Sequence, residues 1–427
     1  MDVIHPRCCG IDISKTDAKV CIRVQKGARA ATEVTTWAAI SSSILELGRY
    51  LIDQQVSLVV MEATGDYWKP FYFLLTETGV EVMLVNPRHV RQIPGRKTDV
   101  ADAVWLADLG AHGLVRGSFV PPKPIRELKD LVRARTILIR LRGQEAQRLE
   151  KLLESAAIKL SSAISDILGV SGRRMLEAMI GGIDDPSTLA EFAHRGIKAT
   201  RQELAEALTG RFTEHHGFLA RVHLDLIDHY TTQIMAVDTR IQDRFTNHDQ
   251  GQTSEPGPGE LSEARELLST IPGVSTTTAE RVIAEIGIDM SVFPTPNQLV
   301  SWAGVAPGIN ESAGKKKTSR TRPGNKHLKG ALGIAALSAI RAKDSFFQAR
   351  YKRICSRRGH SKALVAIERS MLTAIWHILT HKQPYRDLGA NYYAHRRPGI
   401  AIRNAINLLR NAGVTVTFPS PTEAVVT

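Results

Sequence analysis

No stretch of about 18 consecutive apolar residues occurs in this sequence, and a membrane-spanning helix needs roughly that length. The first residues, MDVIHPRCCGIDISK, lack the apolar core of a signal peptide, so nothing marks the protein for export and we expect it in the cytoplasm. Cysteine is also scarce. The four cysteines, at positions 8, 9, 21 and 355, have neither zinc-ligand nor disulfide spacing, which predicts free thiols in a reducing compartment.

Acidic residues are scarce in one part of the chain. Residues 311–410 contain 22 lysines and arginines but only four acids, whereas the whole chain of 427 residues has a net charge of +13. A basic block of this size is typical of a surface that binds a polyanion, because each contact to a phosphate releases counterions. Nucleic acid is therefore the partner that we expect, and a charged surface that meets only solvent is the alternative.

The first 120 residues alternate strand and helix patterns. CCGIDIS, KVCIRVQ and ATEVTTW are strand-like, SSILELGRYLIDQQ is an amphipathic helix, and the apolar runs SLVVMEAT and EVMLVNP predict two further strands. Helices are expected between and after these two runs, so the order predicts an α/β domain with a mixed sheet. The segment VPPKP, residues 120–124, breaks the pattern and predicts a domain boundary.

The middle of the chain, residues 125–246, contains two long helical patterns whose apolar positions are spaced as in a coiled coil. In the first helix these positions are Ile125, Leu128, Val132, Ile139, Ala146, Leu149 and Leu153. In the second helix they are Leu219, Val222, Leu226, Tyr230, Val237 and Ile241. The helices could pair as an antiparallel hairpin within one chain or as a coiled coil between two chains, and the periodicity alone favours neither.

Three further segments complete the predicted organisation. Residues 247–260 have the polar, Gly/Pro-rich composition of a linker, and residues 401–427 are predicted to form a tail. Between them, residues 261–400 are predicted to form a mainly helical C-terminal domain, which contains most of the basic block.

Four acidic residues occupy unusual positions in the first domain. Asp12 lies inside an otherwise apolar strand, where an unpaired charge costs roughly several kcal/mol, and Glu62 ends another strand. Asp99 and Asp102 are three residues apart, so they lie on one face of any helix that starts there. Taken singly, each acid has a structural explanation as a turn or helix cap. Together they predict a site for two Mg²⁺ ions, an arrangement that serves phosphoryl transfer.

The segment LLSTIPGVSTTTAERVIAEIG, residues 267–287, predicts a helix-hairpin-helix. In this interpretation Gly273 lets the backbone approach a DNA phosphate, and the second helix offers its N-terminal amides to the same anion. An ordinary turn between two packed helices is the alternative.

A serine in a loop of small residues follows, in the segment AGVAPGINESAGKKKTSRTRPGNKHLKGAL, residues 303–332. Basic residues come directly after the serine, and we expect them to bind nucleic-acid phosphates. They are Lys315, Lys316, Lys317, Arg320, Arg322, Lys326 and Lys329. Chemistry alone favours a phosphate-binding serine over a nucleophilic one, because serine attack requires a way for the hydroxyl to lose its proton.

These motifs resemble those of a known family. GIDISK, MEATGDYW and KTDVADAVWLA are similar to the motifs of the RuvC-like DEDD transposases of bacterial insertion sequences, the one-ten family. AGVAP, SAGKKK and GNKHLKGAL are similar to the C-terminal motifs of the same family. The resemblance implies an RNase H-like catalytic domain over residues 1–120, whose Mg²⁺ ligands are Asp12, Glu62, Asp99 and Asp102.

The resemblance also implies the reaction and the partners. Ser312 matches the position of the family's nucleophile, which cuts DNA and becomes linked to it as a phosphoserine. Ala313 stands where the family has a glycine, so Ser319 and Ser301 remain alternatives. The implied partners are the DNA of the element ends and target, a non-coding bridge RNA that guides the protein, and further copies of the chain in a dimer or tetramer.

Two other functions remain open from the sequence. One is a metal-only, RuvC-like junction resolvase, in which water replaces serine as the nucleophile and the serine loop only contacts phosphates. The other is a non-catalytic protein that bridges DNA through the predicted hairpin and the basic domain. The resolvase requires the acids but not Ser312, and the bridging protein requires neither.

Overall fold

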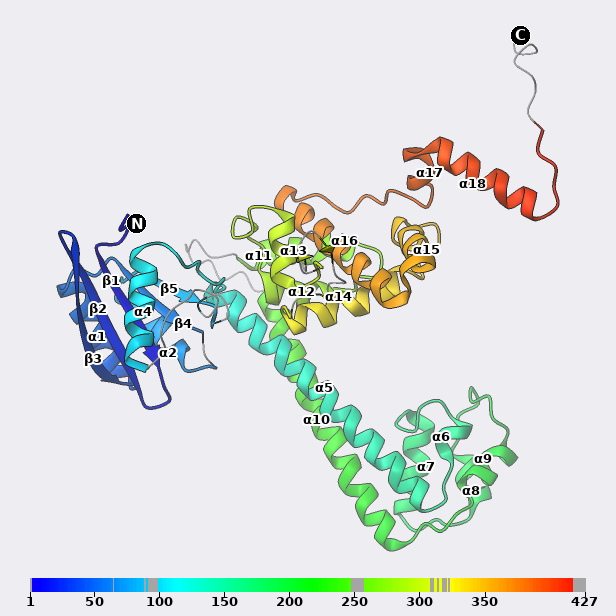
Figure 1. Cartoon of the computed structure of the whole chain (residues 1–427). Coiled ribbons are helices and arrows are strands. Elements are labelled where there is room, and N and C mark those ends of the chain that lie inside the picture. The colour runs from blue at the N-terminus through cyan, green and yellow to red at the C-terminus, as the bar shows by residue number, and fades with distance from the viewer. Residues whose placement is uncertain are drawn as a thin grey trace. The chain divides into compact units, whose positions relative to one another are not determined.

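The computed structural model describes residues 2–63, 65–87, 90, 99–246, 257–307, 311–312, 315–316, 321 and 323–417. Among these, the side chains of residues 99–101, 311–312 and 315–316 lie outside the description. The chain divides into two compact units, Met1–Val120 and Pro121–Thr427. Figure 1 shows the first unit in blue and cyan and the second in colours from cyan to red.

The first unit is built on a five-stranded sheet with the order β3-β2-β1-β4-β5. The strands are β1 (Arg7–Ile13), β2 (Asp17–Lys26), β3 (Arg29–Ala38), β4 (Leu58–Glu62) and β5 (Val82–Val85). The first three are antiparallel neighbours, and β1, β4 and β5 are parallel neighbours. The predicted α/β domain with a mixed sheet is confirmed, and its topology is compatible with an RNase H-like domain.

Helices cover both faces of this sheet. Cys9 and Ile11 point to one face and pack with α1 (Ser41–Asp53) and α2 (Trp68–Glu77), because successive strand residues face opposite sides. In α1 the predicted stripe of apolar residues is buried. Cys8 points to the other face, which is covered by α4 (Asp99–Ala111). Figure 1 shows α4 crossing the sheet on its own face.

Two glycines let α4 lie unusually close to the sheet. A Cβ on Gly10 of β1 would lie 2.1 Å from the carbonyl oxygen of Ala103 and 2.4 Å from the backbone nitrogen of Ala107. A Cβ on Gly110 of α4 would lie 2.7 Å from Cys8 Sγ. All three distances are shorter than van der Waals contact, so a Cβ at Gly10 would displace the backbone of α4 and one at Gly110 would displace side chains of the sheet. The close approach fixes where the first turn of α4 lies on the sheet.

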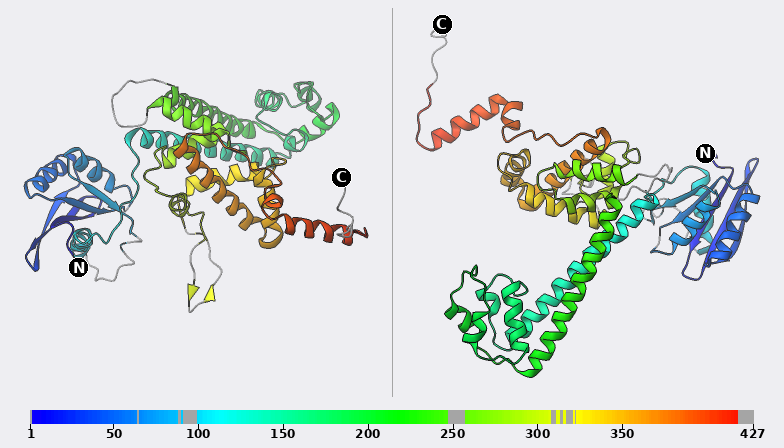
Figure 2. Two further views of the ribbon diagram at one scale, coloured as in Figure 1. Left: turned by 90° about the horizontal axis from the view of Figure 1, so that it is seen from above. Right: turned by 180° about the vertical axis from the view of Figure 1, so that it is seen from behind.

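Two long antiparallel helices organise the second unit. They are α5 (Lys123–Ser155) and α10 (Glu214–Thr246), which lie side by side in Figures 1 and 2. Three contacts along their length define the antiparallel direction, and these join Glu127 to Arg244, Arg135 to Asp238, and Glu145 to His223. The structure therefore has the hairpin within one chain, the first of the two arrangements that the sequence left open.

The apolar stripe that we predicted on these helices is partly wrong. Ile139, Val222 and Leu226 are 38%, 39% and 37% exposed. The residues that α10 buries include Leu224 and Ile227 instead. In α5 the predicted Ile125, Leu128, Val132, Leu149 and Leu153 are buried, but two charged residues also occupy buried positions, where partners on neighbouring helices neutralise them. Arg135 and Glu145 are both almost fully buried.

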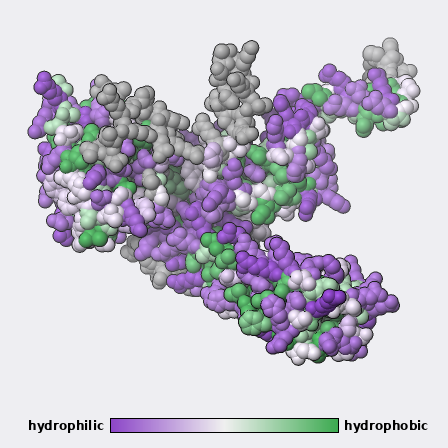
Figure 3. All heavy atoms as spheres, turned by 60° about the horizontal axis from the view of Figure 1, so that its bottom comes forward, coloured by the Kyte–Doolittle hydropathy of each residue, from purple (hydrophilic) through white to green (hydrophobic). Residues whose placement is uncertain are grey.

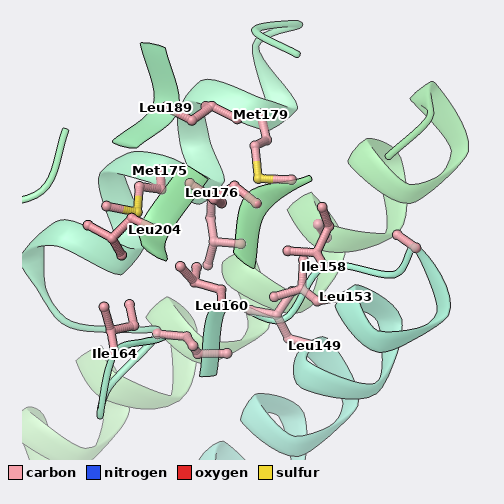
Figure 4. Packing of buried hydrophobic residues seen from close by; sticks show 14 of the residues in the cluster. Leu149, Leu153, Ile158, Leu160, Ile164, Met175, Leu176, Met179, Leu189 and Leu204 are labelled. Atoms are coloured by element: carbon pink, nitrogen blue, oxygen red, sulfur yellow. The ribbon is translucent and has the colours of Figure 1, made fainter. Parts of the chain in front are cut away.

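A small helical subdomain connects the far ends of α5 and α10. It contains α6 (Leu160–Ala163), α7 (Val170–Ile180), α8 (Pro186–Glu191) and α9 (Arg201–Leu208). Figure 4 shows side chains from these helices and from the end of α5 converging in one core. The core includes Leu149, Leu160, Met175, Leu176 and Leu204. Sequence periodicity did not reveal this subdomain within residues 125–246.

The remaining helices form the C-terminal part of the second unit. They are α11 (Pro258–Ser269), α12 (Thr276–Ile286), α13 (Pro296–Ala303), α14 (Lys326–Ala339), α15 (Phe346–Arg358), α16 (His360–His381), α17 (Tyr392–Arg396) and α18 (Pro398–Asn411). The predicted tail, residues 401–427, therefore begins inside a helix, α18. On the face that Figure 3 shows, hydrophilic residues predominate and hydrophobic residues form scattered patches.

One described helix, α16, is long and apolar enough to cross a membrane by composition alone. Its apolar side is buried inside the protein, because Ile367, Met371, Leu372 and Ile375 are fully buried and α16 packs against α13, α14 and α15. The burial identifies α16 as the core helix of the C-terminal part.

Candidate active site

Asp12 and Glu62 lie next to each other at the ends of the two central parallel strands. Ile11 of β1 is paired with Met61 of β4, so Asp12 and Glu62 follow at the next position of each strand. Neighbouring strands are about 4.8 Å apart. Both acids point to the face that α4 covers, because Gly10 and Val60, two residues earlier, contact that helix. The register therefore brings together two acids that are 50 positions apart in the sequence.

The first turn of α4 lies toward the same strand ends. Gly110 contacts Cys8 near the start of β1, whereas Ala103 contacts Gly10, so α4 runs antiparallel to β1. Residues before Ala103 therefore extend toward Asp12. Asp102 is partly buried and lies one turn before the buried Leu106. Asp99 is the first residue of α4, and its side chain lies outside the described part of the chain.

A divalent metal fits the chemistry of this donor set. Carboxylate oxygens are hard ligands, and Mg²⁺ typically takes one or two protein carboxylates and completes its shell with water and phosphate oxygens. Among the described side chains no group of three or more His, Cys, Asp or Glu residues is close enough to hold a metal ion. Of the four predicted ligands, Asp12 and Glu62 are the two that the strand register makes neighbours.

The predicted serine lies in a β-hairpin between α13 and α14. Its two short strands are β6 (Glu311–Ser312) and β7 (Lys315–Lys316), in which Ser312 is paired with Lys315. A further bridge joins Pro307 to Thr321. We call residues 307–321 the serine hairpin; the left view of Figure 2 shows its strands away from the helices of the unit. Ser312 thus occupies the last strand position before the turn.

Backbone contacts anchor the base of the serine hairpin. Gly304 ends α13 in the left-handed region, with φ of +74°, a conformation that favours glycine. A Cβ on Gly324 would lie 2.1 Å from the Ala303 carbonyl oxygen, so the strand leaving the hairpin runs against the end of α13. Asn325 then caps α14, because its side-chain oxygen accepts hydrogen bonds from the amides of His327 and Leu328.

The other predicted residues of this region lie at several places. Lys315 and Lys316 are in β7, Lys326 is exposed in the first turn of α14, and Lys329 is partly buried in the same turn. Ser301, an alternative nucleophile, is exposed in α13. Three basic residues and the other alternative serine lie outside the described residues, and these are Lys317, Arg320, Arg322 and Ser319.

The predicted hairpin at residues 267–287 consists of α11, a turn and α12. Gly273, in the turn, has φ of +86°, and a Cβ there would lie 2.4 Å from the carbonyl oxygen of Ala335 and 2.5 Å from the amide nitrogen of Ala339. The glycine is therefore required for the turn to pack on the backbone of α14, a structural reason that the sequence did not reveal. Its predicted contact with DNA stays a prediction.

Sequence reasoning missed a network of buried ion pairs behind the serine hairpin. Glu285 of α12 is 2% exposed and receives two hydrogen bonds from Arg133 of α5, at 2.8 and 2.9 Å. Glu280, five residues earlier in α12, is 1% exposed and pairs with Arg135 at 3.0 Å. A signal was present in the sequence, because both acids lie in the apolar helix TTTAERVIAEI.

Burial and neighbouring groups shift the pKa values of two residues in this network. Burial alone would raise the pKa of the Glu285 carboxyl, but hydrogen bonds from Arg133 and Asn325 outweigh burial and lower it. His327, in the first turn of α14, has a lowered pKa because it is partly buried and lies near the Arg133 charge. The imidazole of His327 is thus biased toward its neutral form beside the base of the serine hairpin.

The topology of the first unit can be compared with that of known classes of protein. A five-stranded mixed sheet that carries neighbouring acids at the ends of its central parallel strands is compatible with the RNase H-like class of nucleic-acid enzymes.

Two family models match the chain. One is a transposase model, the DEDD domain of IS110 elements, over residues 9–158, and the other is the transposase IS116/IS110/IS902 family over residues 265–352. The chain belongs to the IS110 family of insertion-sequence transposases, enzymes that cut and rejoin DNA.

Similar curated proteins extend over most of the chain. The transposase for insertion sequence element IS1111A of Coxiella burnetii is 25% identical over 88% of this chain and 90% of its own length. The pilin gene-inverting protein of Moraxella bovis is 23% identical over 88% of this chain and 96% of its own length. The mini-circle putative transposase for IS117 of Streptomyces coelicolor is 24% identical over 70% of this chain and 75% of its own length.

Proposed function

We propose that this transposase cuts and rejoins DNA strands by using a Mg²⁺ site made of Asp12, Glu62, Asp99 and Asp102 together with Ser312 as the nucleophile. The observation that carries the proposal is the register of β1 and β4, which makes Asp12 and Glu62 neighbours on the face covered by α4. Mg²⁺ bound there would neutralise charge that develops on the phosphate during strand transfer.

The serine step conserves the energy of the phosphodiester bond, because it exchanges one phosphate ester for another. The Oγ of Ser312 forms a bond to phosphorus while the bond from phosphorus to one deoxyribose oxygen breaks, and that oxygen leaves as a hydroxyl after taking up a proton. The proton lost by Ser312 passes to solvent or to a carboxylate. In the second step a deoxyribose hydroxyl of another strand attacks the phosphoserine and releases Ser312. No energy source is needed, because one phosphate ester replaces another at each step.

The basic residues around Ser312 would support both steps. Lys315 is paired with Ser312 across the serine hairpin, and Lys326 and Lys329 follow in the first turn of α14. Their charges would stabilise the extra negative charge of a pentacoordinate phosphorus.

The partners follow from the same proposal. The substrates are the DNA ends of an insertion sequence and its target, and a non-coding bridge RNA is the proposed guide. The Moraxella relative is named for inverting a pilin gene, and an inversion also requires strands to be cut and rejoined. Two duplexes must meet during recombination, so we propose a dimer or tetramer that works on the bacterial nucleoid in the cytoplasm.

Covalent trapping tests this function. Purified protein is incubated with element-end DNA, the flanking transcript and Mg²⁺, and a denaturation-resistant protein–DNA adduct is then sought by gel electrophoresis. We expect an adduct that is lost in both Ser312→Ala and Asp102→Ala, with Ser301→Ala as the matched control that retains it. Cleavage without an adduct, unaffected by Ser312→Ala, would instead support the metal-only resolvase. DNA binding without cleavage in every variant would support the bridging protein.

A further inference from the structure

A cavity of about 750 Å³ lies between α15 and the helices α17 and α18, away from the serine hairpin in sequence. Five of its lining residues are arginines. They are Arg350, Arg353 and Arg357 of α15, Arg396 of α17, and Arg397 between α17 and α18. The α15 arginines are three and four residues apart, so they share one face of the helix.

No carboxylate compensates these charges within the described part of the chain. None of the five arginines forms an ion pair with a described aspartate or glutamate, and no acid lines the cavity. The Nε atom of Arg350 is buried and has no hydrogen-bond partner there. Like charges gathered in one cavity repel each other, and a buried donor without an acceptor costs free energy. Both features indicate that an anion completes the site.

The arginines are held in place by aromatic residues. Arg350 donates a hydrogen bond to the Tyr393 hydroxyl at 2.9 Å, and the Arg353 guanidinium lies 4.3 Å from the centre of the Tyr393 ring. The Tyr393 ring stacks on Phe346 with a centroid distance of 5.9 Å, which attaches α17 to α15. Guanidinium groups fixed in this way lose little freedom on binding a ligand.

We propose that this cavity is a second nucleic-acid site, which binds the phosphodiester backbone of a strand through its arginines. The guanidinium fork matches two phosphate oxygens at once, and five forks in one cavity fit several consecutive phosphates better than a single small anion. The cavity shares no residue with the proposed Mg²⁺ site or with the serine hairpin, so the proposal does not depend on the identity of the nucleophile.

Two arginines suit the test because their removal breaks no contact. The side chains of Arg357 and Arg397 have no hydrogen bond, ion pair or ring contact with any residue that the structure describes. The test variant is Arg357→Gln/Arg397→Gln in the full chain. The control is Lys343→Gln/Lys352→Gln, which removes the same charge from exposed residues of the same region outside the cavity.

Fluorescence anisotropy measures binding to labelled single-stranded RNA, single-stranded DNA and duplex DNA over a series of salt concentrations. For a single strand we expect the arginine variant to bind roughly tenfold or more weakly and to lose about 1.4 from the slope of log affinity against log salt, or about 0.7 for each contact. The control should lose less than half of this. Arg357→Lys/Arg397→Lys should recover the salt slope but only part of the affinity, because lysine keeps the charge without the fork.

The three probes also identify the source of the backbone. A loss confined to RNA assigns the site to an RNA strand, a loss confined to DNA assigns it to DNA, and a loss on all probes indicates backbone recognition alone. Unchanged affinity and slope in the arginine variant, or equal losses in the control, would overturn the proposal. The binding measurement requires no cleavage, so its result is independent of that of adduct trapping.

Discussion

Glu285 accepts a hydrogen bond from the side chain of Asn325, with 2.6 Å between Nδ2 and Oε2. Asn325 is at the same time the N-cap of α14, the helix that follows the serine hairpin. Because Glu285 is also paired with Arg133, one buried carboxylate joins the start of α14 to α12 and α5. The exit of the serine hairpin is therefore held by the interior of the protein.

Replacing the Asn325 side chain should separate its two roles. Asn325→Ser keeps an N-cap oxygen but removes the amide that donates to Glu285, so we expect a loss of about 1–2 kcal/mol in the free energy of unfolding. Asn325→Ala removes both and should cost about 1 kcal/mol more. Urea denaturation measures both losses. Thr295→Ala, which removes the N-cap oxygen of α13, is the control for capping alone. Equal stability of Asn325→Ser and wild type would show that the contact with Glu285 contributes nothing.

The Glu285 carboxylate should make stability depend on pH. Its pKa is lower in the folded protein than its ordinary value of 4.5, so its contribution is present above about pH 4.5 and is lost as the pH falls through the folded pKa. Glu285→Gln should be less stable than wild type at pH 7 by roughly 1–3 kcal/mol. The difference should shrink as the pH falls below 4.5, as measured by denaturation at each pH. A difference that stays constant down to pH 3 would contradict the linkage.

Close packing of α4 on the sheet should be sensitive to a single methyl group. Gly10→Ala places a Cβ 2.1 Å from a backbone oxygen of α4, and we expect a loss of about 3 kcal/mol or displacement of the helix. Because α4 carries Asp99 and Asp102, DNA cleavage should fall as well. Gly117→Ala is the control, since its Cβ would meet only Met83 at 3.4 Å. Full activity and stability of Gly10→Ala would mean that α4 does not approach the sheet this closely.

Three of the four thiols should resist modification in the native protein. Burial raises the pKa of Cys8 to about 12 and that of Cys21 to about 11, and it raises the pKa of Cys9 as well. The reactive thiolate is thus rare at pH 8, and reagents cannot reach it. Titration with a disulfide reagent should detect Cys355 alone before denaturation and all four thiols afterwards. Cys355→Ser should abolish the native reaction; a second fast thiol would contradict the burial.

Sequence patterns predicted the first unit well because its signals are local. Alternating apolar residues fix each strand, and the β1 to β5 order with its helices agrees with the prediction. The long helices α5 and α10 were also predicted, together with most apolar residues of the buried face of α5, but the buried face of α10 was largely not. Arg135 and Glu145 look like surface residues in the sequence, and only their partners on other helices make burial favourable.

The sequence by itself determined the elements of the first unit, the two long helices, the basic C-terminal region and the family, because spacing, composition and short motifs lie along the chain. Tertiary structure decided which distant residues meet. The parallel pairing of β1 with β4 made neighbours of Asp12 and Glu62, and the hairpin of α5 and α10 formed within one chain. Folding also gathered arginines from α15 and α17 into one cavity. Such meetings depend on register and on close backbone approach at Gly10 and Gly273, which act through space between segments that the sequence keeps apart.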